Sequence, residues 1–507
     1  MKDKSFGFWR LIAWPVHRSE TKKVVSMLLL MSLLCICYSI LRNIKDVIIL
    51  TGKSSGAEVI PFIKVWGILP GAIAATWFYT KLRSRFSREK VFYLIVGSFI
   101  TYFLLFAFVI FPYSDALNFQ QFGQMLREHL PSGFNGLIAM ICNWTHTSFY
   151  IISEMWAVIV LTVLFWGFAN DTTPLSEARR TYGLLNLGSN AAPIVGGMLA
   201  NLFVHHLLVS PKAVTHEQWH MTLIQLTLLI SFFGLCAIGT FYWINRKVMS
   251  SETTTDQDAY NQSVKNSAKK RLSLRDCIRY ISKSKYLTCL ALIVLGYNIA
   301  INFTDILWKE QLKKCFSDPK DMLAHMNHVT IAIGCFATLG GLFFSVMVRR
   351  FGWAFVALLT PSLMFILGIG FFSFLFFGNL LSGLAATLFG TTPLLMTVYW
   401  GSMQNALSKA GKYSVFDASK ELAFLAVSPE ARLRGKAAID GLGSGVGKSG
   451  ASLSFQALIL SLGSITLCAP YIATILTVIF FAWIYSVVGV SKEFNVKSKE
   501  IEAGELA

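Results

Sequence analysis

The chain has 507 residues, of which 54% are hydrophobic and only 14% carry a charged side chain. Soluble globular proteins average roughly 25% charged residues. The composition therefore excludes a soluble globular protein and indicates a polytopic membrane protein. The net charge of +18 would suit nucleic acid, but the lysines and arginines fall in short segments between apolar runs. Membrane topology explains such a distribution, and we expect no nucleic-acid partner.

The chain contains twelve apolar runs that are long enough to cross a bilayer, which takes about 20 residues. In chain order they are 24–50, 59–80, 90–111, 135–169, 180–206, 219–244, 285–308, 324–348, 352–377, 380–407, 435–463 and 468–490. The 135–169 run is long for one span, so we interpret its first part as an interfacial helix. The predicted fold class is an all-α membrane protein with twelve transmembrane helices in two six-helix halves.

The longest polar stretch between the runs divides the spans six and six. It predicts an N-terminal segment 1–23, a first half 24–244, a basic linker 245–284, a second half 285–490 and a tail 491–507. Such a linker is typical of a solvated strap near anionic lipid headgroups.

Lysines and arginines also indicate the orientation of the chain. They gather in the N-terminal segment, after the second and eighth runs, in the tail, and in the connection after the tenth run, which includes Lys409, Lys412 and Lys420. These segments share one side if the spans alternate, and the positive-inside rule makes that side cytoplasmic. Both termini are therefore expected in the cytoplasm. The start of the chain lacks an apolar core with a cleavage site, so we expect no cleaved presequence.

The first run carries three charges, Arg42, Lys45 and Asp46, within an otherwise apolar stretch. A charge at mid-bilayer costs about 2.5–3.5 kcal/mol on insertion scales, and such residues usually face a partner or a water-filled cavity. The alternative is that they mark the end of a short helix and snorkel to the interface. Because Val47–Leu50 continues the apolar run, we favour the cavity.

The two halves share a short internal match. Tyr38–Asp46 in the first run aligns without gaps on Tyr297–Asp305 in the seventh, with four identical positions of nine. Internal duplication is common in transporters. The match makes Asp46 and Asp305 equivalent across a pseudo-two-fold axis along the membrane normal.

Both halves place polar residues inside predicted spans. They are Arg42, Lys45, Asp46, Lys64, Asn143, His146, Glu154, Asn302, Asp305, Lys309, Gln404, Asn405, Asp440 and Lys448. Buried cations beside hydrogen-bonding amides suit a polyanion such as a nucleotide phosphate chain. The carboxylates can neutralise those cations when the site is empty. No catalytic triad or metal-ligand cluster stands out in the sequence, so we expect neither an enzyme nor a cofactor.

Aromatic side chains at similar depth could stack on a base. The candidates are Tyr38, Trp66, Trp156 and Tyr297, although for any one of them core packing is the commoner role.

Several segments of the chain resemble the non-mitochondrial ATP/ADP translocases, or nucleotide transporters, of obligate intracellular bacteria and plastids. They are Leu41–Asp46, Gly56–Lys64, Ser153–Trp156, Phe165–Asn170, Ser176–Arg180, Gly390–Leu394, Phe416–Glu421, Gly435–Asp440 and Gly447–Gly450. The resemblance implies a twelve-span fold related to the major facilitator architecture and exchange of ATP for ADP. It places the charged transport residues on Lys45, Glu154, Asp305 and Lys448. With Arg42, Asp46 and Asn302, these complete the predicted substrate-binding set.

The chain departs from the family pattern at Asp305, where Glu is usual, and at Asn43, where many exchangers have Asp. Both changes alter the reach or charge expected of the pocket. They leave open proton-coupled net import of nucleoside triphosphates and NAD/ADP exchange. A receptor or lipid scramblase is the alternative from another class. The expected partners are nucleotides and the lipid bilayer. We expect the protein to be a monomer in a bacterial inner membrane.

Overall fold

The computed structural model describes residues 16–205, 216–248, 284–427 and 447–502, together with 279, 281–282, 435–436 and 438–439. These residues form helices and connections, without a strand. Asp440, the ends of the chain and most of the predicted linker 245–284 lie outside the described residues.

The first half contains both spanning helices and short helices that cap one end. In chain order they are α2 (Thr21–Thr51), α3 (Val59–Phe62), η1 (Ile63–Ile68), α4 (Leu69–Arg85), α5 (Arg88–Leu105), η2 (Phe106–Ile110), α6 (Ser114–Leu117), α7 (Gln120–His129), η3 (Ser132–Phe134), α8 (Asn135–Cys142), α9 (Trp144–Met155), η4 (Trp156–Phe165), α10 (Trp166–Thr172), α11 (Leu175–His205), α12 (His216–Trp243) and η5 (Ile244–Val248).

The second half continues in the same all-helical manner. Its elements are α15 (Lys285–Cys315), α16 (Pro319–Phe377), α17 (Ser382–Phe389), α18 (Pro393–Gly411), η8 (Lys412–Phe416), α19 (Asp417–Leu425), α21 (Lys448–Leu462) and α22 (Ile465–Glu502). The last of these extends past the predicted end of the twelfth span at residue 490.

Nine helical stretches among the described residues are long and apolar enough to cross a membrane. The longest, Pro319–Phe377, holds two helices that meet at Gly352, whose φ of 81° is a conformation that favours glycine. The predicted runs 324–348 and 352–377 lie on either side of this residue. The helix α21 lies within the predicted eleventh run, 435–463.

Two predicted runs are interrupted in the structure. The 135–169 run breaks at Asn143, where φ −95° and ψ 46° separate α8 from α9. The 380–407 run was predicted wrongly at both ends. Gly390 terminates α17 with a φ of 60°, and α18 begins at Pro393. The helix then continues through η8 and α19 to Leu425.

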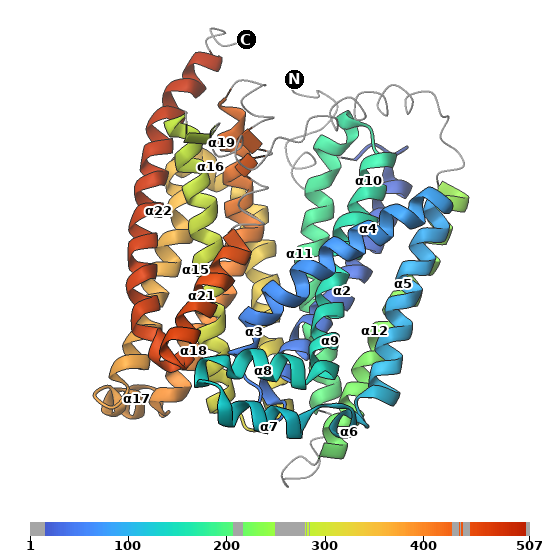
Figure 1. Ribbon diagram of the computed structural model, residues 1–507. Helices are drawn as coiled ribbons and strands as arrows, with labels where there is room; N and C mark the ends of the chain where they lie inside the picture. Colours follow the sequence, from blue (N-terminus) through green and yellow to red (C-terminus); the bar gives the residue numbers. More distant parts are fainter. Residues whose placement is uncertain are drawn as a thin grey trace.

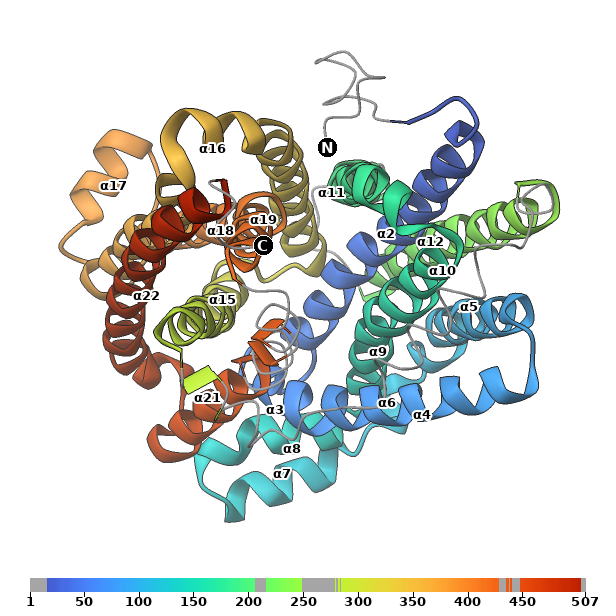
Figure 2. The same cartoon turned by 90° about the horizontal axis from the view of Figure 1, so that it is seen from above.

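The helices form two groups that lie side by side, with α2–α12 in one and α15–α22 in the other (Figure 2). The start of α2 and the end of α22 lie at the same end of the molecule, which we call the proximal end (Figure 1). The opposite, distal end carries the short helices α6, α7 and α8.

A buried chain of amides joins the two halves. Asn43 Nδ2 donates to Asn327 Oδ1 at 2.8 Å, and Asn327 Nδ2 donates to Asn201 Oδ1 at 2.9 Å. Beside them, Arg42 donates to Thr330 Oγ1 at 3.1 Å. Because Asn327 and Thr330 belong to α16 while the other three residues belong to α2 and α11, all three hydrogen bonds cross between the halves.

Further contacts hold the halves together nearer the distal end. Gln456 Nε2 on α21 donates to the Pro61 carbonyl at 2.8 Å, and Lys313 Nζ on α15 donates to the Ser55 carbonyl at 2.5 Å. A side chain at Gly56 would meet the Lys313 ammonium at 2.6 Å, so only glycine fits without displacement. The halves are therefore closed against each other on the distal side.

Removal of the Asn43 amide tests this seam. We expect Asn43→Ala to destabilise the protein by about 1–3 kcal/mol, because the buried Asn327 carbonyl loses its donor. The measurement is thermal unfolding in detergent. The control is Lys53→Ala, whose pair with Asp115 joins side chains that are 66% and 59% exposed, and which should cost less than about 1 kcal/mol. Equal effects of the two variants would contradict the assigned seam.

Candidate functional site

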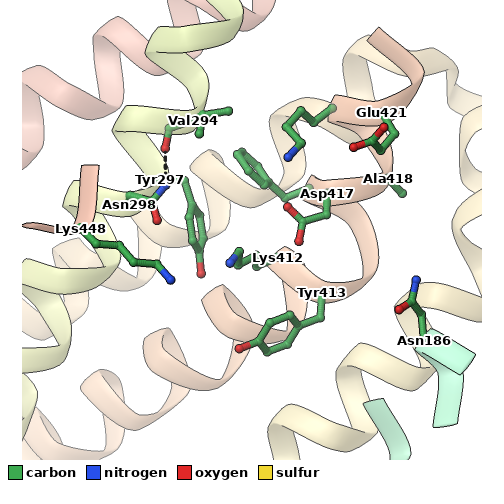
Figure 3. Close-up of a pocket in the computed structure, with 12 residues that line it drawn as sticks. Asn186, Val294, Tyr297, Asn298, Lys412, Tyr413, Asp417, Ala418, Glu421 and Lys448 are labelled. Carbon is green, nitrogen blue, oxygen red and sulfur yellow. Dashed lines mark hydrogen bonds between the residues drawn. The ribbon is translucent and has the colours of Figure 1, made fainter. Parts of the chain in front are cut away.

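Two adjoining cavities lie between the halves. The vestibule, of about 590 Å³, is drawn in Figure 3 and is lined by Asn186, Val294, Tyr297, Asn298, Lys412, Tyr413, Phe416, Asp417, Ala418, Lys420, Glu421 and Lys448. The central cavity has a volume of about 380 Å³. Its charged and amide-bearing lining residues are Arg42, Lys45, Asp46, Lys64, Glu154, Asn298, Asn302, Asp305, Lys309, Lys409, Lys412 and Lys448.

The two cavities adjoin each other. They share five lining residues, which are Tyr297, Asn298, Lys412, Tyr413 and Lys448. The vestibule lies on the proximal side of the central cavity, because its wall includes α19, which Figure 1 places at that end. Since the distal side is closed by contacts between the halves, the central cavity communicates with the proximal end.

The central cavity carries a large excess of positive charge. Seven cationic side chains and three carboxylates line it, which leaves four positive charges uncompensated. Charges removed from water repel one another strongly unless a counter-charge is present. An excess of this kind suits a polyanionic ligand.

One group of cations is paired with carboxylates. Lys45 Nζ lies 2.9 Å from Glu154 Oε1 and 3.1 Å from Asp46 Oδ1, and it sits 3.8 Å from the centre of the Tyr150 ring. Lys45 is 2% exposed. Since a buried ammonium needs compensation, this lysine is held in place by the two carboxylates.

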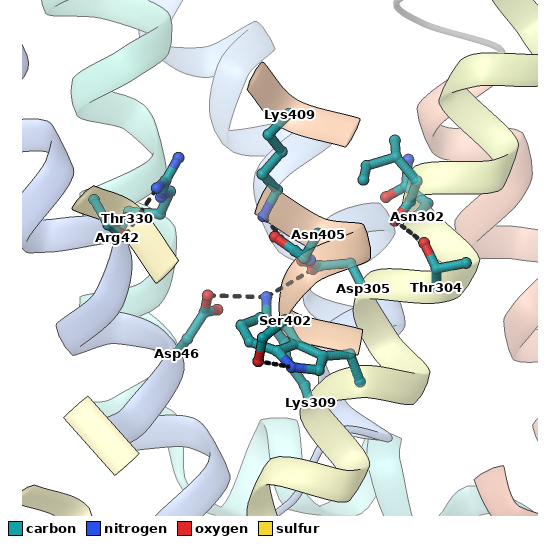
Figure 4. Close-up of polar contacts among 12 residues, drawn as sticks. Arg42, Asp46, Asn302, Thr304, Asp305, Lys309, Thr330, Ser402, Asn405 and Lys409 are labelled. Carbon is teal, nitrogen blue, oxygen red and sulfur yellow. Dashed lines mark hydrogen bonds and ion pairs between the residues drawn. The ribbon is translucent and has the colours of Figure 1, made fainter. Parts of the chain in front are cut away.

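Lys309 makes two ion pairs, one of which crosses between the halves. Its Nζ lies 2.8 Å from Asp46 Oδ2 on α2 and 2.8 Å from Asp305 Oδ2 on its own helix, α15 (Figure 4). The other oxygen of Asp305 accepts from Lys409 Nζ at 3.0 Å and from Asn405 Nδ2 at 2.8 Å. Asp46 and Asp305, which the internal match made equivalent, thus meet at a single ammonium group.

Four cations of the central cavity have no carboxylate as ion-pair partner among the described residues. Arg42 donates to the Thr330 hydroxyl, and Lys64 donates to Asn302 Oδ1 at 2.8 Å. Lys412 lies 5.7 Å from the ring centres of both Tyr297 and Tyr413. The fourth is Lys448, whose side chain points toward the vestibule in Figure 3.

All seven residues of the predicted substrate-binding set line the central cavity. They are Arg42, Lys45, Asp46, Glu154, Asn302, Asp305 and Lys448. Asn43 does not, because it lies in the seam between the halves. The structure therefore brings these seven residues together around one cavity, and their part in substrate binding stays a prediction.

Sequence reasoning missed two of the charged residues that line the central cavity. Lys409 and Lys412 were assigned to the connection after the tenth run, yet they lie on α18 and η8 and line the central cavity. The available signal was the helical spacing of Asn405, Lys409 and Lys412, which places them on one face. Lys64 and Lys309 were recognised as intramembrane charges but not included in the binding set.

The aromatic candidates separate into two groups. Tyr38 and Tyr297 line the central cavity. Trp156 is fully buried and donates to the Leu34 carbonyl at 3.1 Å, so it belongs to the core. Trp66 is 61% exposed and donates to Gln456 Oε1 at 3.2 Å, outside both cavities.

The chain matches a model of the TLC ATP/ADP transporter family over residues 1–494. It is 38% identical to ADP,ATP carrier protein 1 of Chlamydia muridarum, with 99% of this chain and 94% of the relative covered. It is 34% identical to the chloroplastic ADP,ATP carrier protein 2 of Arabidopsis thaliana, with 96% and 77% covered.

Solved structures resemble the fold at low sequence identity. A D-xylose-proton symporter matches with a TM-score of 0.53 at 11% identity over 93% of this chain and 97% of its own. A bacterial homologue of the iron transporter ferroportin, in an inward-facing state, matches with a TM-score of 0.50 at 16% identity, over 95% and 98%. These likenesses concern the fold alone. Together with the full-length family match, they identify the chain as a multi-pass membrane protein of the TLC ATP/ADP transporter family, with a fold like that of the major facilitator transporters.

Proposed function

We propose that this chain exchanges nucleotides across a membrane, ATP for ADP, by alternating access. The observation that carries the proposal is the excess of four positive charges in the central cavity, which equals the charge of ATP⁴⁻. The ADP,ATP carriers among its relatives support the same substrates. We place the protein in a bacterial inner membrane as a monomer, with both termini and the open proximal end in the cytoplasm.

The unpaired cations are the first contacts that we assign to the phosphate chain. Arg42, Lys64, Lys412 and Lys448 can meet phosphate oxygens without first breaking an ion pair. Charge-assisted hydrogen bonds of this kind are the strongest that proteins make.

The ion pairs stabilise the carrier when no nucleotide is bound. Glu154, Asp46 and Asp305 compensate Lys45 and Lys309 when no nucleotide is present. Without these carboxylates the buried cations would be left uncompensated, which is strongly destabilising. Phosphate oxygens that approach Lys309 compete with Asp46 and so weaken a link between the halves.

The same charge balance favours exchange over net import. An empty cavity with four excess charges must carry that charge as it reorients, whereas a cavity that holds ATP⁴⁻ is neutral. Moving one charge against 100 mV costs about 2.3 kcal/mol. Net uptake of ATP⁴⁻ would cost roughly four times as much on the same scale. Exchange for ADP³⁻ moves a single net charge.

Proteoliposomes decide between exchange and net import. With labelled ATP outside, we expect uptake only when ADP is present inside, and competition by unlabelled ATP and ADP. Uptake into empty vesicles that a protonophore abolishes would instead establish a proton-coupled importer. Competition by GTP, UTP, CTP and NAD in the same vesicles gives the base preference and tests NAD/ADP exchange.

Lys448→Gln separates phosphate recognition from stability. Because Lys448 has no carboxylate partner among the described residues, its loss orphans no anion. We expect unchanged thermal stability and at least about a tenfold weaker competition by ATP, since a charge-assisted hydrogen bond contributes about 1.5–3 kcal/mol. AMP should be affected less than ATP. The matched control, Lys53→Ala at the exposed pair with Asp115, should leave competition unchanged, and an equal loss in both variants would contradict the assignment.

Lys45→Gln should lower both stability and exchange, because it leaves Glu154 and Asp46 without this cation. Breaking a buried pair from one side costs about 3–5 kcal/mol. We expect Lys45→Gln combined with Glu154→Gln to recover part of the melting temperature but not the exchange rate. Recovery of exchange in the double variant would show that Lys45 serves structure only.

A further inference from the structure

Tyr413 is an exposed aromatic residue inside a polar cavity. It lines both the vestibule and the central cavity, and its side chain is 46% exposed. Lys412 is the neighbour that contacts its ring, at 5.7 Å from the centre. By contrast, Tyr297 is 2% exposed, and Phe416 packs against it with ring centres 4.9 Å apart. Tyr413 therefore presents a ring face that a flat ligand can cover.

The charge balance differs between the two cavities. Apart from Lys412 and Lys448, which it shares with the central cavity, the vestibule is lined by Lys420, Asp417 and Glu421. Glu421 pairs with Lys436 Nζ at 2.6 Å, so these charges balance. The central cavity has an excess of four. A ligand with a polyanionic end and a neutral end would therefore bind with its anionic end in the central cavity and its neutral end in the vestibule.

Asn186 faces this group from the other half. It belongs to α11, whereas Tyr413 and Asp417 belong to η8 and α19. Figure 3 shows Asn186 to one side of Tyr413 and Asp417, with Lys448 and Asn298 on their other side. A carboxamide presents a donor and an acceptor side by side, which matches the N6 and N7 edge of adenine. The vestibule thus combines a stacking surface from one half with a base-reading group from the other.

We propose that the vestibule is the nucleoside subsite, in which the base stacks on Tyr413 and Asn186 reads its edge while the phosphates occupy the central cavity. This inference rests on the proposed nucleotide transport. Stacking accepts any base and contributes affinity, whereas the Asn186 amide provides the preference for adenine. Because the two side chains come from opposite halves, a bound base touches both.

Inorganic tripolyphosphate distinguishes the two subsites, since it carries the polyanionic end alone. For Tyr413→Ala we expect the KM for ATP to rise about five- to a hundredfold, the range of base stacking. Inhibition by tripolyphosphate should stay within about twofold of the unaltered protein. Tyr413→Phe retains the ring and should keep the KM. Tyr485→Ala is the matched control, because Tyr485 is 70% exposed on α22 and lines neither cavity.

Asn186→Ala tests base reading separately. We expect the ratio of ATP to GTP competition to fall at least about threefold, with tripolyphosphate inhibition unchanged. Lys448→Gln should weaken inhibition by both ATP and tripolyphosphate. An unchanged KM in Tyr413→Ala, or equal losses for ATP and tripolyphosphate, would overturn the nucleoside subsite. Failure of the unaltered protein to exchange nucleotides would instead remove the proposed function.

Discussion

The shared ion pair of Lys309 with Asp46 and Asp305 is the interaction on which the rest of the site depends. Charges at membrane depth persist only when they are compensated, and here one ammonium group compensates a carboxylate from each half. Lys45 and Lys409 then attach to the same carboxylates from either side. The two halves are joined electrostatically at the place where a polyanion would compete for the cations, which couples occupancy of the site to the contact between the halves.

The cavity separates two kinds of cation by their partners. Lys45, Lys309 and Lys409 are paired with carboxylates, whereas Arg42, Lys64, Lys412 and Lys448 are not, and two of these, Lys412 and Lys448, also line the vestibule. A substrate that enters from the proximal end therefore meets available positive charge before it meets the paired network. In the exchange that we propose, attraction of the substrate comes first, and exchange of ion-pair partners follows deeper in the cavity.

Much of this arrangement is readable from the sequence, because intramembrane charge is costly and therefore informative. The sequence predicts a cavity from the charges of Arg42, Lys45 and Asp46. The internal match also relates Asp46 to Asp305, and in the structure both contact Lys309. Lys409 and Lys412 were misread because the positive-inside rule assigns basic residues near the end of an apolar run to a loop. The boundary itself was wrong there, since Gly390 and Pro393 shift the start of α18 and its helix continues to Leu425. Pairing partners such as Asn43 with Asn327 depend on tertiary packing that periodicity does not encode.

Part of the cavity wall comes from π-helical turns, Lys64 from η1 and Lys412 with Tyr413 from η8. A π-turn accommodates one more residue than an α-turn, and each residue of a helix is rotated by about 100° from the one before it. Deleting a single residue within either segment would change the rotation of the neighbouring side chains relative to the cavity. In these two segments the direction of a side chain therefore depends on the number of residues in the turn as well as on the residue type.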